Sequence, residues 1–188
     1  MVIKPAAKGG AADYEPQHLS LILVGLPTLI ATGFRDLDAK LDGGMNAGEV
    51  IVMAGRPSMG KTALAVGMGA YVARTVGTVL VFSLEMPGSQ LTQRSLARDG
   101  RIPMPHIKNG ANMTEADLAS LTKTVEDLTH LPMLIDESPC LSLAEIASRS
   151  RAVKRRHGLS LIIVNYIGLM SGGRRKSHTA VIHEEFTA

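Results

Sequence analysis

Short runs of apolar, largely β-branched residues recur along the chain, and longer stretches with helical periodicity separate them. The apolar runs cover residues 49–54, 78–83, 132–136 and 159–165. Runs of this length are typical of strands buried on both faces. The other stretches predict helices over residues 34–41, 61–76, 89–98, from 114 onward and 142–156. Strands that alternate with helices imply right-handed βαβ crossovers, so the sequence predicts an α/β fold with a mostly parallel sheet and helices on both faces.

Two of the predicted helices carry a recognisable start signal. Thr114 and Ser142 are each followed three residues later by an acidic side chain, Asp117 and Glu145, which is the capping-box arrangement. The apolar side chains of the first of these helices recur with helical spacing and form its apolar face: Leu118, Leu121, Val125 and Leu128. The preceding residues 101–110 contain proline and glycine, and they predict a loop.

Residues 1–31 predict an N-terminal arm or linker rather than part of the core. The first 18 residues mix glycine, alanine, proline and charges, which favours a mobile segment. Residues 19–31 are apolar, but they are too few to cross a bilayer, so we expect no membrane partner. A signal-peptide core is disfavoured because Asp13 and Glu15 precede the run. We therefore expect the run to pack on its own domain or on a neighbouring chain.

Composition narrows the class of protein. The chain has 188 residues, 45% of them hydrophobic, which suits one compact domain. Its formal net charge of +3 is too small to indicate nucleic-acid binding by itself. The single cysteine, Cys140, excludes an internal disulfide and fits a cytoplasmic location. Aromatic residues make up 3% of the chain, so a platform that stacks single-stranded bases is not expected as the main binding device.

Residues 55–62 read Gly-Arg-Pro-Ser-Met-Gly-Lys-Thr, a complete phosphate-binding loop of the form G-x-x-x-x-G-K-[ST]. A strand pattern precedes it and a helix pattern follows it, as such a loop requires. The residues predicted to cradle the phosphates of a nucleotide are Gly55, Ser58, Met59, Gly60, Lys61 and Thr62. Lys61 is placed to reach the phosphates as a point charge, and the Thr62 hydroxyl is placed to bind Mg²⁺. The alternative is an ordinary surface turn rich in glycine and serine.

Two further polar residues follow predicted strands, where ligands of open α/β sheets bind. Glu85 comes just after residues 78–83 and could polarise a water molecule for attack on the γ-phosphate. It could equally serve as a favourable anion at the start of the next helix. Asn165 ends the last apolar run, where a Walker B strand normally carries an aspartate that holds the Mg²⁺ shell. Because an amide brings no negative charge, we expect weaker Mg²⁺ coordination than an aspartate would give.

Four segments occur in one order along the chain: Thr-Gly-Phe-Arg-Asp-Leu-Asp at 32–38, Ala-Gly-Arg-Pro-Ser-Met-Gly-Lys-Thr at 54–62, Phe-Ser-Leu-Glu-Met at 82–86 and Val-Asn-Tyr-Ile-Gly-Leu-Met at 164–170. Together they closely resemble the ATPase domain of DnaB-type replicative DNA helicases. The resemblance implies a RecA-like P-loop NTPase fold over residues 32–173, with ATP and Mg²⁺ as ligands. It also implies that Lys61 binds phosphates, that Thr62 binds Mg²⁺ and that Glu85 is the catalytic residue that activates the attacking water.

The same resemblance implies the partners. Members of the family act as rings of six on single-stranded DNA, so we expect a homo-hexamer or association with full-length helicase subunits. The tail, residues 174–188, has little pattern and begins with a basic segment. Its cations Arg174, Arg175 and Lys176 are candidates for DNA contact, because the family's loop after this strand lies near the central channel. Such a charge run is also compatible with a solvated surface.

The departures from the family pattern lead to a second hypothesis. Asn165 stands where the family has aspartate, and Gly168 stands where it usually has glutamine. The sequence also ends soon after the last predicted strand, so we expect a fold that is incomplete at its C-terminal side relative to the family. The first hypothesis is a helicase motor that couples ATP hydrolysis to movement along DNA and unwinding during replication. The second is a catalytically impaired nucleotide-binding module that joins or caps a full-length helicase ring.

Overall fold

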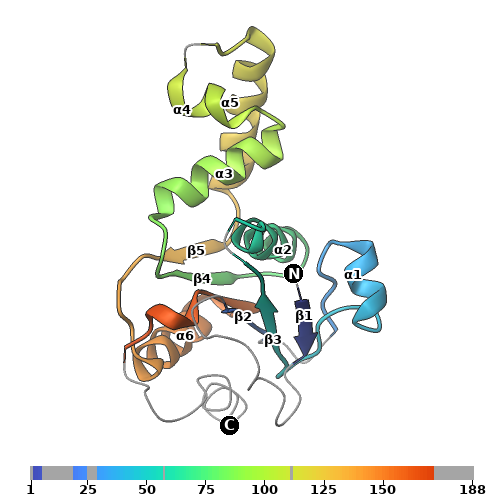
Figure 1. Ribbon diagram of the computed structural model, residues 1–188, viewed down its shortest axis with the longest axis vertical. Coiled ribbons are helices and arrows are strands. Elements are labelled where there is room, and N and C mark those ends of the chain that lie inside the picture. The colour runs from blue at the N-terminus through green and yellow to red at the C-terminus, as the bar shows by residue number, and fades with distance from the viewer. Residues whose placement is uncertain (1, 6–18, 25–28, 57, 111, 172–188) are drawn as a thin grey trace.

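A six-stranded sheet forms the centre of the molecule in the computed structural model, which describes residues 2–5, 19–24, 29–56, 58–110 and 112–171. Its strands are β1 Val2–Pro5, β2 Leu19–Val24, β3 Val50–Ala54, β4 Val79–Ser83, β5 Met133–Asp136 and β6 Leu161–Asn165. They lie side by side in the order β1-β3-β2-β6-β4-β5 (Figure 1). The four strands predicted from apolar runs are therefore all present, as β3, β4, β5 and β6.

Those four strands run in one direction, and the two N-terminal strands oppose them. Strand β4 pairs in parallel with both β5 and β6. Strand β2 is antiparallel to β6 on one side and to β3 on the other, so β3 and β6 share a direction. Strand β1 is antiparallel to β3. The predicted α/β fold with a mostly parallel sheet is confirmed, and each antiparallel pair of the described strands involves an N-terminal strand.

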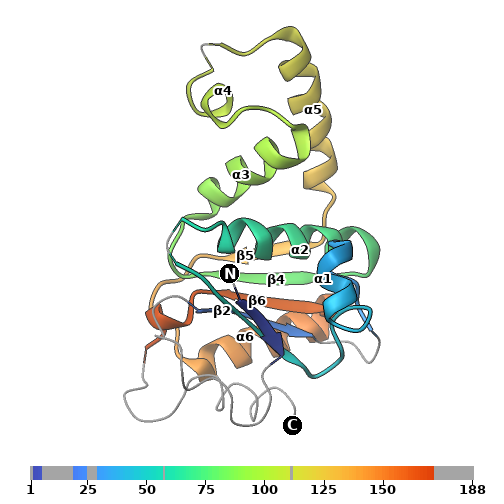
Figure 2. The same ribbon diagram turned by 45° about the vertical axis from the view of Figure 1, so that its right-hand side comes forward.

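Helices cover both faces of the sheet. The helices are α1 Arg35–Lys40, α2 Lys61–Thr75, α3 Gly88–Gly100, α4 Met104–Asn109, α5 Glu115–Thr129 and α6 Leu143–His157. Helix α2 lies on one face and α6 on the other (Figure 2). Alternate strand residues supply the two cores: Val79 and Val81 pack in the cluster with α2, whereas Leu80 and Phe82 pack in the cluster with α6. This alternation is the two-residue period of a strand buried on both sides.

The two capping boxes are confirmed. The Thr114 hydroxyl accepts a hydrogen bond from the backbone N–H of Asp117 at 3.1 Å, and the Ser142 hydroxyl accepts one from Glu145 at 3.3 Å. Each acidic side chain in turn accepts the backbone N–H of the capping residue. The boxes fix where α5 and α6 begin, which is why both starts could be read from the sequence.

The expectation of a mobile arm over the first 18 residues is wrong for Val2–Pro5, which form β1 at the edge of the sheet. Residues 6–18 lie outside the described part of the chain. The apolar run from residue 19 does pack on its own domain, but as a strand in the middle of the sheet rather than against its surface. Whether residues 1–31 form a unit apart from residues 32–173 stays a prediction.

Residues 101–110 are not entirely a loop as predicted, because Met104–Asn109 form the short helix α4. Pro103 is its N-cap residue and Pro105 lies in its first turn, where the missing N–H of proline costs nothing. Gly110 ends the helix in the left-handed conformation with φ 65°. The prolines and the glycine that suggested a loop therefore mark the two ends of a helix.

The predicted apolar face of α5 is only partly covered within the described structure. Leu118 and Val125 are 50% and 46% exposed, whereas Thr124 is buried. Thr124 is buried because α5 approaches the end of α3 closely there: the neighbouring Ser120 hydroxyl donates to the Gly100 carbonyl at 2.7 Å. A Cβ atom at Gly100 would lie 3.1 Å from Oγ1 of Thr124. The two helices therefore leave little room for larger side chains at positions 100 and 124.

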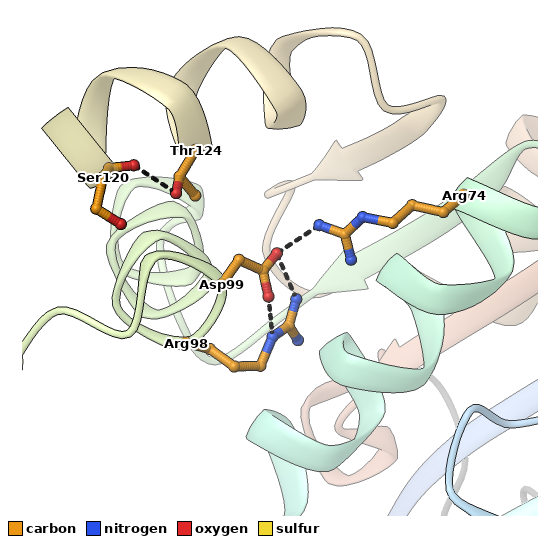
Figure 3. A network of polar contacts seen from close by, with 5 residues as sticks. All are labelled: Arg74, Arg98, Asp99, Ser120 and Thr124. Carbon is orange, nitrogen blue, oxygen red and sulfur yellow. Dashed lines mark hydrogen bonds and ion pairs between the residues drawn. The ribbon is translucent and has the colours of Figure 1, made fainter.

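Helices α3, α4 and α5 project from the sheet beyond α2 (Figures 1 and 2). An ionic network fastens this projection to α2 (Figure 3). The Asp99 carboxylate of α3 accepts hydrogen bonds from Arg74 of α2 at 2.6 Å and from its neighbour Arg98 at 2.6 and 3.0 Å. Burial would raise the pKa of the Asp99 carboxyl group, but the two guanidinium groups outweigh this and hold it below its ordinary value.

Replacing Asp99 by asparagine is expected to lower the free energy of unfolding by about 1 kcal/mol at neutral pH, since the pairs are partly exposed. A folded-state pKa below the unfolded one stabilises the protein above the unfolded pKa, and this is lost as the pH falls through the folded pKa. Urea unfolding at neutral and acid pH therefore should show the difference shrink in acid. Asp127→Asn, at an exposed position of α5, is the control. A deficit of equal size at both pH values would contradict the argument.

Candidate functional site

The loop between β3 and α2 has the backbone geometry of a phosphate cradle. Gly60, the N-cap of α2, is left-handed with φ 81°, and Ser58 is left-handed with φ 64°. A Cβ atom at Gly60 would meet nothing within 4 Å, so the backbone conformation rather than space favours glycine there. Residues that leave the right-handed region turn successive N–H groups toward one point, which suits an anion. Pro57 lies outside the described residues.

The start of α2 is open to an anion. Gly60 makes no side-chain capping bond, and the first turn holds no acidic residue, in contrast to the capped and acidic first turns of α5 and α6. The first N–H groups of a helix have no partner within it, and the helix dipole adds positive potential at that end. The side chains of Arg56, Ser58 and Met59 are exposed, with Met59 at 57%. Phosphate oxygens can therefore reach the backbone of this turn.

Lys61 is the first residue of α2, and its side chain lies near Glu85 and Tyr166. Burial lowers the pKa of Lys61 below its ordinary value, and the nearby negative charge of Glu85 opposes that lowering. Its Nζ lies 5.3 Å from the centre of the Tyr166 ring, directly after β6. The Lys61 ammonium group thus lies near the C-terminal ends of β3, β4 and β6. These are the three strands whose ends carry the site residues predicted from the sequence.

Thr62 and Asn165 meet at the same C-terminal ends of the parallel strands. The Thr62 hydroxyl donates to Oδ1 of Asn165 at 3.1 Å, and the Ser20 hydroxyl donates to the same oxygen at 2.9 Å. Asn165 is 1% exposed, and within the described residues its Nδ2 has no hydrogen-bond partner. Hydroxyl and amide oxygens are ligands that suit Mg²⁺, directly or through water, but neither brings a negative charge. The residues can hold the ion, with less electrostatic attraction than an aspartate would supply.

Glu85 is exposed in the turn that follows β4. The Ser83 hydroxyl donates to the Met86 carbonyl at 2.5 Å, which closes this turn. Helix α3 begins at Gly88, and its first turn contains no acidic residue. The carboxylate that accepts the N–H of Gly88, at 2.7 Å, belongs to Glu137 instead. The anion at the start of α3 is therefore Glu137, and Glu85 is left facing solvent near Lys61.

The structure brings together Lys61, Thr62, Glu85 and Asn165 at the C-terminal ends of the parallel strands. Gly168 is exposed, close to the end of the described chain. Arg174, Arg175 and Lys176 lie outside the described residues. Sequence reasoning missed Ser20 and Tyr166. Ser20 gave one signal, as the one hydroxyl residue in the apolar stretch 19–24, but its partner is 145 residues away and could not be read from the pattern.

No group of three or more His, Cys, Asp and Glu side chains in the described part of the chain could hold a metal ion. No described helix combines the length and the apolar character needed to cross a bilayer.

The sequence has relatives of known identity. The family model "DnaB-like helicase C terminal domain" matches residues 29–186. The chain is 37% identical over 153 residues to "Replicative DNA helicase DnaC" of Bacillus subtilis (strain 168), covering 80% of this chain and 33% of that protein. It is 40% identical over 146 residues to "Replicative DNA helicase DnaB" of Pasteurella multocida (strain Pm70), covering 76% and 31%. The chain therefore spans about a third of the length of these relatives.

Solved structures share the fold. One whose title describes it as an ATPase domain superposes with a TM-score of 0.62 at 23% identity, over 70% of this chain and 50% of that one. A second, titled "The Structure Of A DnaB-Like Replicative Helicase And Its Interactions With Primase", gives a TM-score of 0.58 at 22% identity, over 70% and 32%. At this identity the likeness concerns the fold alone, and it confirms the predicted RecA-like architecture.

Proposed function

The chain belongs to the family of DnaB-like helicase C-terminal domains, and from this premise we propose that it is a replicative-helicase-type ATPase that binds Mg·ATP in the loop between β3 and α2. One observation carries the proposal: the hydrogen bond of 3.1 Å between the Thr62 hydroxyl and Asn165. It joins the first turn of the loop helix to the end of β6, across 103 residues of sequence. Two motifs that are separate in the sequence thereby form one site.

Each residue of the proposed site has a distinct task. The N–H groups of the turn from Gly55 to Gly60, with Ser58 and Met59 between them, bind the phosphates, and Lys61 supplies the positive charge. Thr62 would hold Mg²⁺, and Asn165 orients the Thr62 hydroxyl by accepting a hydrogen bond from it. Bound Mg²⁺ would neutralise negative charge on the phosphates. Glu85 holds and polarises the attacking water, for which its exposed position near Lys61 is suited.

The relatives support a proposal for the wider function. We propose that ATP hydrolysis drives movement along single-stranded DNA and unwinding, within a homo-hexamer or a ring shared with full-length helicase subunits. The basic segment Arg174, Arg175 and Lys176 is the proposed DNA contact. Replication of DNA would place the chain in the cytoplasm.

The test is ATP hydrolysis by the purified chain, with and without single-stranded DNA, with Lys61→Ala as the blank. Turnover that DNA stimulates and that the variant lacks would support the proposal. A chain that binds Mg·ATP but does not turn it over would instead favour a second candidate, a nucleotide-binding module that joins or caps a helicase ring. The neutral Asn165 is the observation behind this second candidate, since it weakens the metal site on which hydrolysis depends.

Replacing Asn165 by aspartate is expected to lower the Mg²⁺ concentration that gives half-maximal nucleotide binding by about tenfold. A carboxylate adds attraction for the cation, although part of it is offset by the cost of burying the charge. A titration of Mg²⁺ at fixed ATP measures the shift. Asn109→Asp adds the same charge at an exposed position of α4 and should leave the titration unchanged. Equal Mg²⁺ dependence of wild type and Asn165→Asp would contradict the hypothesis of a weakened metal site.

A further inference from the structure

Strand β2 occupies a place in the sheet that touches the proposed nucleotide site. It lies between β3, which leads into the phosphate loop, and β6, which ends at Asn165. In the register of these pairs, residue 20 stands opposite Met53 on one side and opposite Asn165 on the other. The N-terminal strand therefore carries one residue to the point where the two functional strands end.

That residue, Ser20, is fully buried, with no exposed surface. A buried hydroxyl is costly unless it is hydrogen-bonded, and Ser20 meets this need by donating to Oδ1 of Asn165 at 2.9 Å. The same oxygen accepts the Thr62 hydroxyl at 3.1 Å. Three residues from distant parts of the chain thus converge on one amide oxygen.

The position of the Asn165 side chain rests on two hydroxyl groups, from Ser20 and Thr62, which both lie within hydrogen-bond distance of its amide oxygen. Within the described residues its buried Nδ2 has no hydrogen-bond partner. A hydroxyl can accept as well as donate, so Thr62 alone does not decide whether oxygen or nitrogen faces it. With Ser20 removed, the amide loses one of its two described partners and can turn about its terminal torsion to present nitrogen to Thr62.

This orientation matters for a cation at Thr62. When the Thr62 hydroxyl donates its proton to Asn165, its lone pairs remain free to face a metal ion. When an amide nitrogen takes the place of the oxygen, the nitrogen's hydrogens compete for those lone pairs and bring positive partial charge close to the cation site. The phosphate-binding N–H groups belong to the backbone of the turn and do not depend on this amide.

We propose that Ser20 is a positioning residue of the nucleotide site, which holds the Asn165 amide so that Thr62 can bind the divalent cation. This role rests on the proposed function, because it presumes that the loop binds Mg·ATP. Through Ser20, the N-terminal strand β2 contributes to the nucleotide site as well as to the sheet. Ser20 does not touch the nucleotide and acts through Asn165.

The test compares ATP affinity in excess Mg²⁺ with ATP affinity in EDTA. Ser20→Ala removes the hydroxyl with little change of volume, and it is expected to weaken Mg·ATP binding about three- to tenfold, the effect of one hydrogen bond. Affinity for metal-free ATP should change less than about twofold, since the phosphate contacts remain. In an Asn165→Asp background the loss should shrink, because both oxygens of a carboxylate can accept and its orientation no longer decides the outcome.

Ile22→Val is the matched control, since Ile22 is also fully buried in β2 but has no polar group. It reports what a weaker strand alone does, and it should leave the ratio of the two affinities unchanged. The proposal is overturned if Ser20→Ala keeps the wild-type ratio, if it lowers both affinities equally, or if Ile22→Val reproduces its effect. A wild-type chain that binds Mg·ATP no better than Lys61→Ala overturns the proposed function, and the role of Ser20 falls with it.

Discussion

Replacing Lys61 by alanine is expected to weaken Mg·ATP binding about 10- to 100-fold and to reduce turnover by about 10²–10³. The ammonium group belongs to the first residue of α2, a helix whose N-terminal turn carries no acidic side chain. Among the protein groups proposed to contact the phosphates, its removal leaves the backbone N–H groups, and these supply partial rather than full charges. The loss should be larger for turnover, because negative charge on the transferred phosphoryl group develops further in the transition state.

Calorimetric titration with a slowly hydrolysed ATP analogue, together with a phosphate-release assay, measures both effects. Lys123→Ala removes the same group from an exposed position of α5 and should change neither. Thermal unfolding of both variants shows whether the fold persists. Turnover by Lys61→Ala at the wild-type rate would place the ATPase outside this loop and would refute the proposed site.

The sequence was sufficient where local chemistry decides the structure. A β-branched run, a capping box or a glycine in a phosphate loop acts over a few residues, so β4, α6 and the start of α2 could all be predicted. The motifs also identified Lys61, Thr62 and Asn165 as candidate site residues without any information on their distances. The structure does bring Thr62 to Asn165.

The sequence failed where the decisive partner is remote. Apolar periodicity states which residues share a face, but not what covers it, so it could not show that Leu118 and Val125 would be exposed. The run from residue 19 has the hydrophobicity of a central strand, but nothing local places it between β3 and β6. Ser20 was missed for the same reason, because its function depends on pairing across the sheet with Asn165.

Glu85→Gln is expected to lower ATP turnover by about 10²–10⁴ while Mg·ATP affinity stays within about twofold. Glutamine keeps the size and the hydrogen-bonding capacity of the side chain but cannot accept the proton of an attacking water. The alternative function of Glu85, as the anion that stabilises the start of α3, has lost its structural basis. That helix begins at Gly88, and the carboxylate bonded to its first N–H is Glu137, at 2.7 Å.

Glu137→Gln is therefore the matched control, because it removes a carboxylate from the adjacent loop. Its amide oxygen can still accept the Gly88 N–H, so turnover should fall less than about threefold, with a small loss of stability from the weaker helix-dipole interaction. A single-turnover assay at saturating Mg·ATP separates the chemical step from binding for both variants. If Glu137→Gln were the inactive variant and Glu85→Gln the active one, the water-activating carboxylate would have to be assigned to the end of β5 rather than to the end of β4.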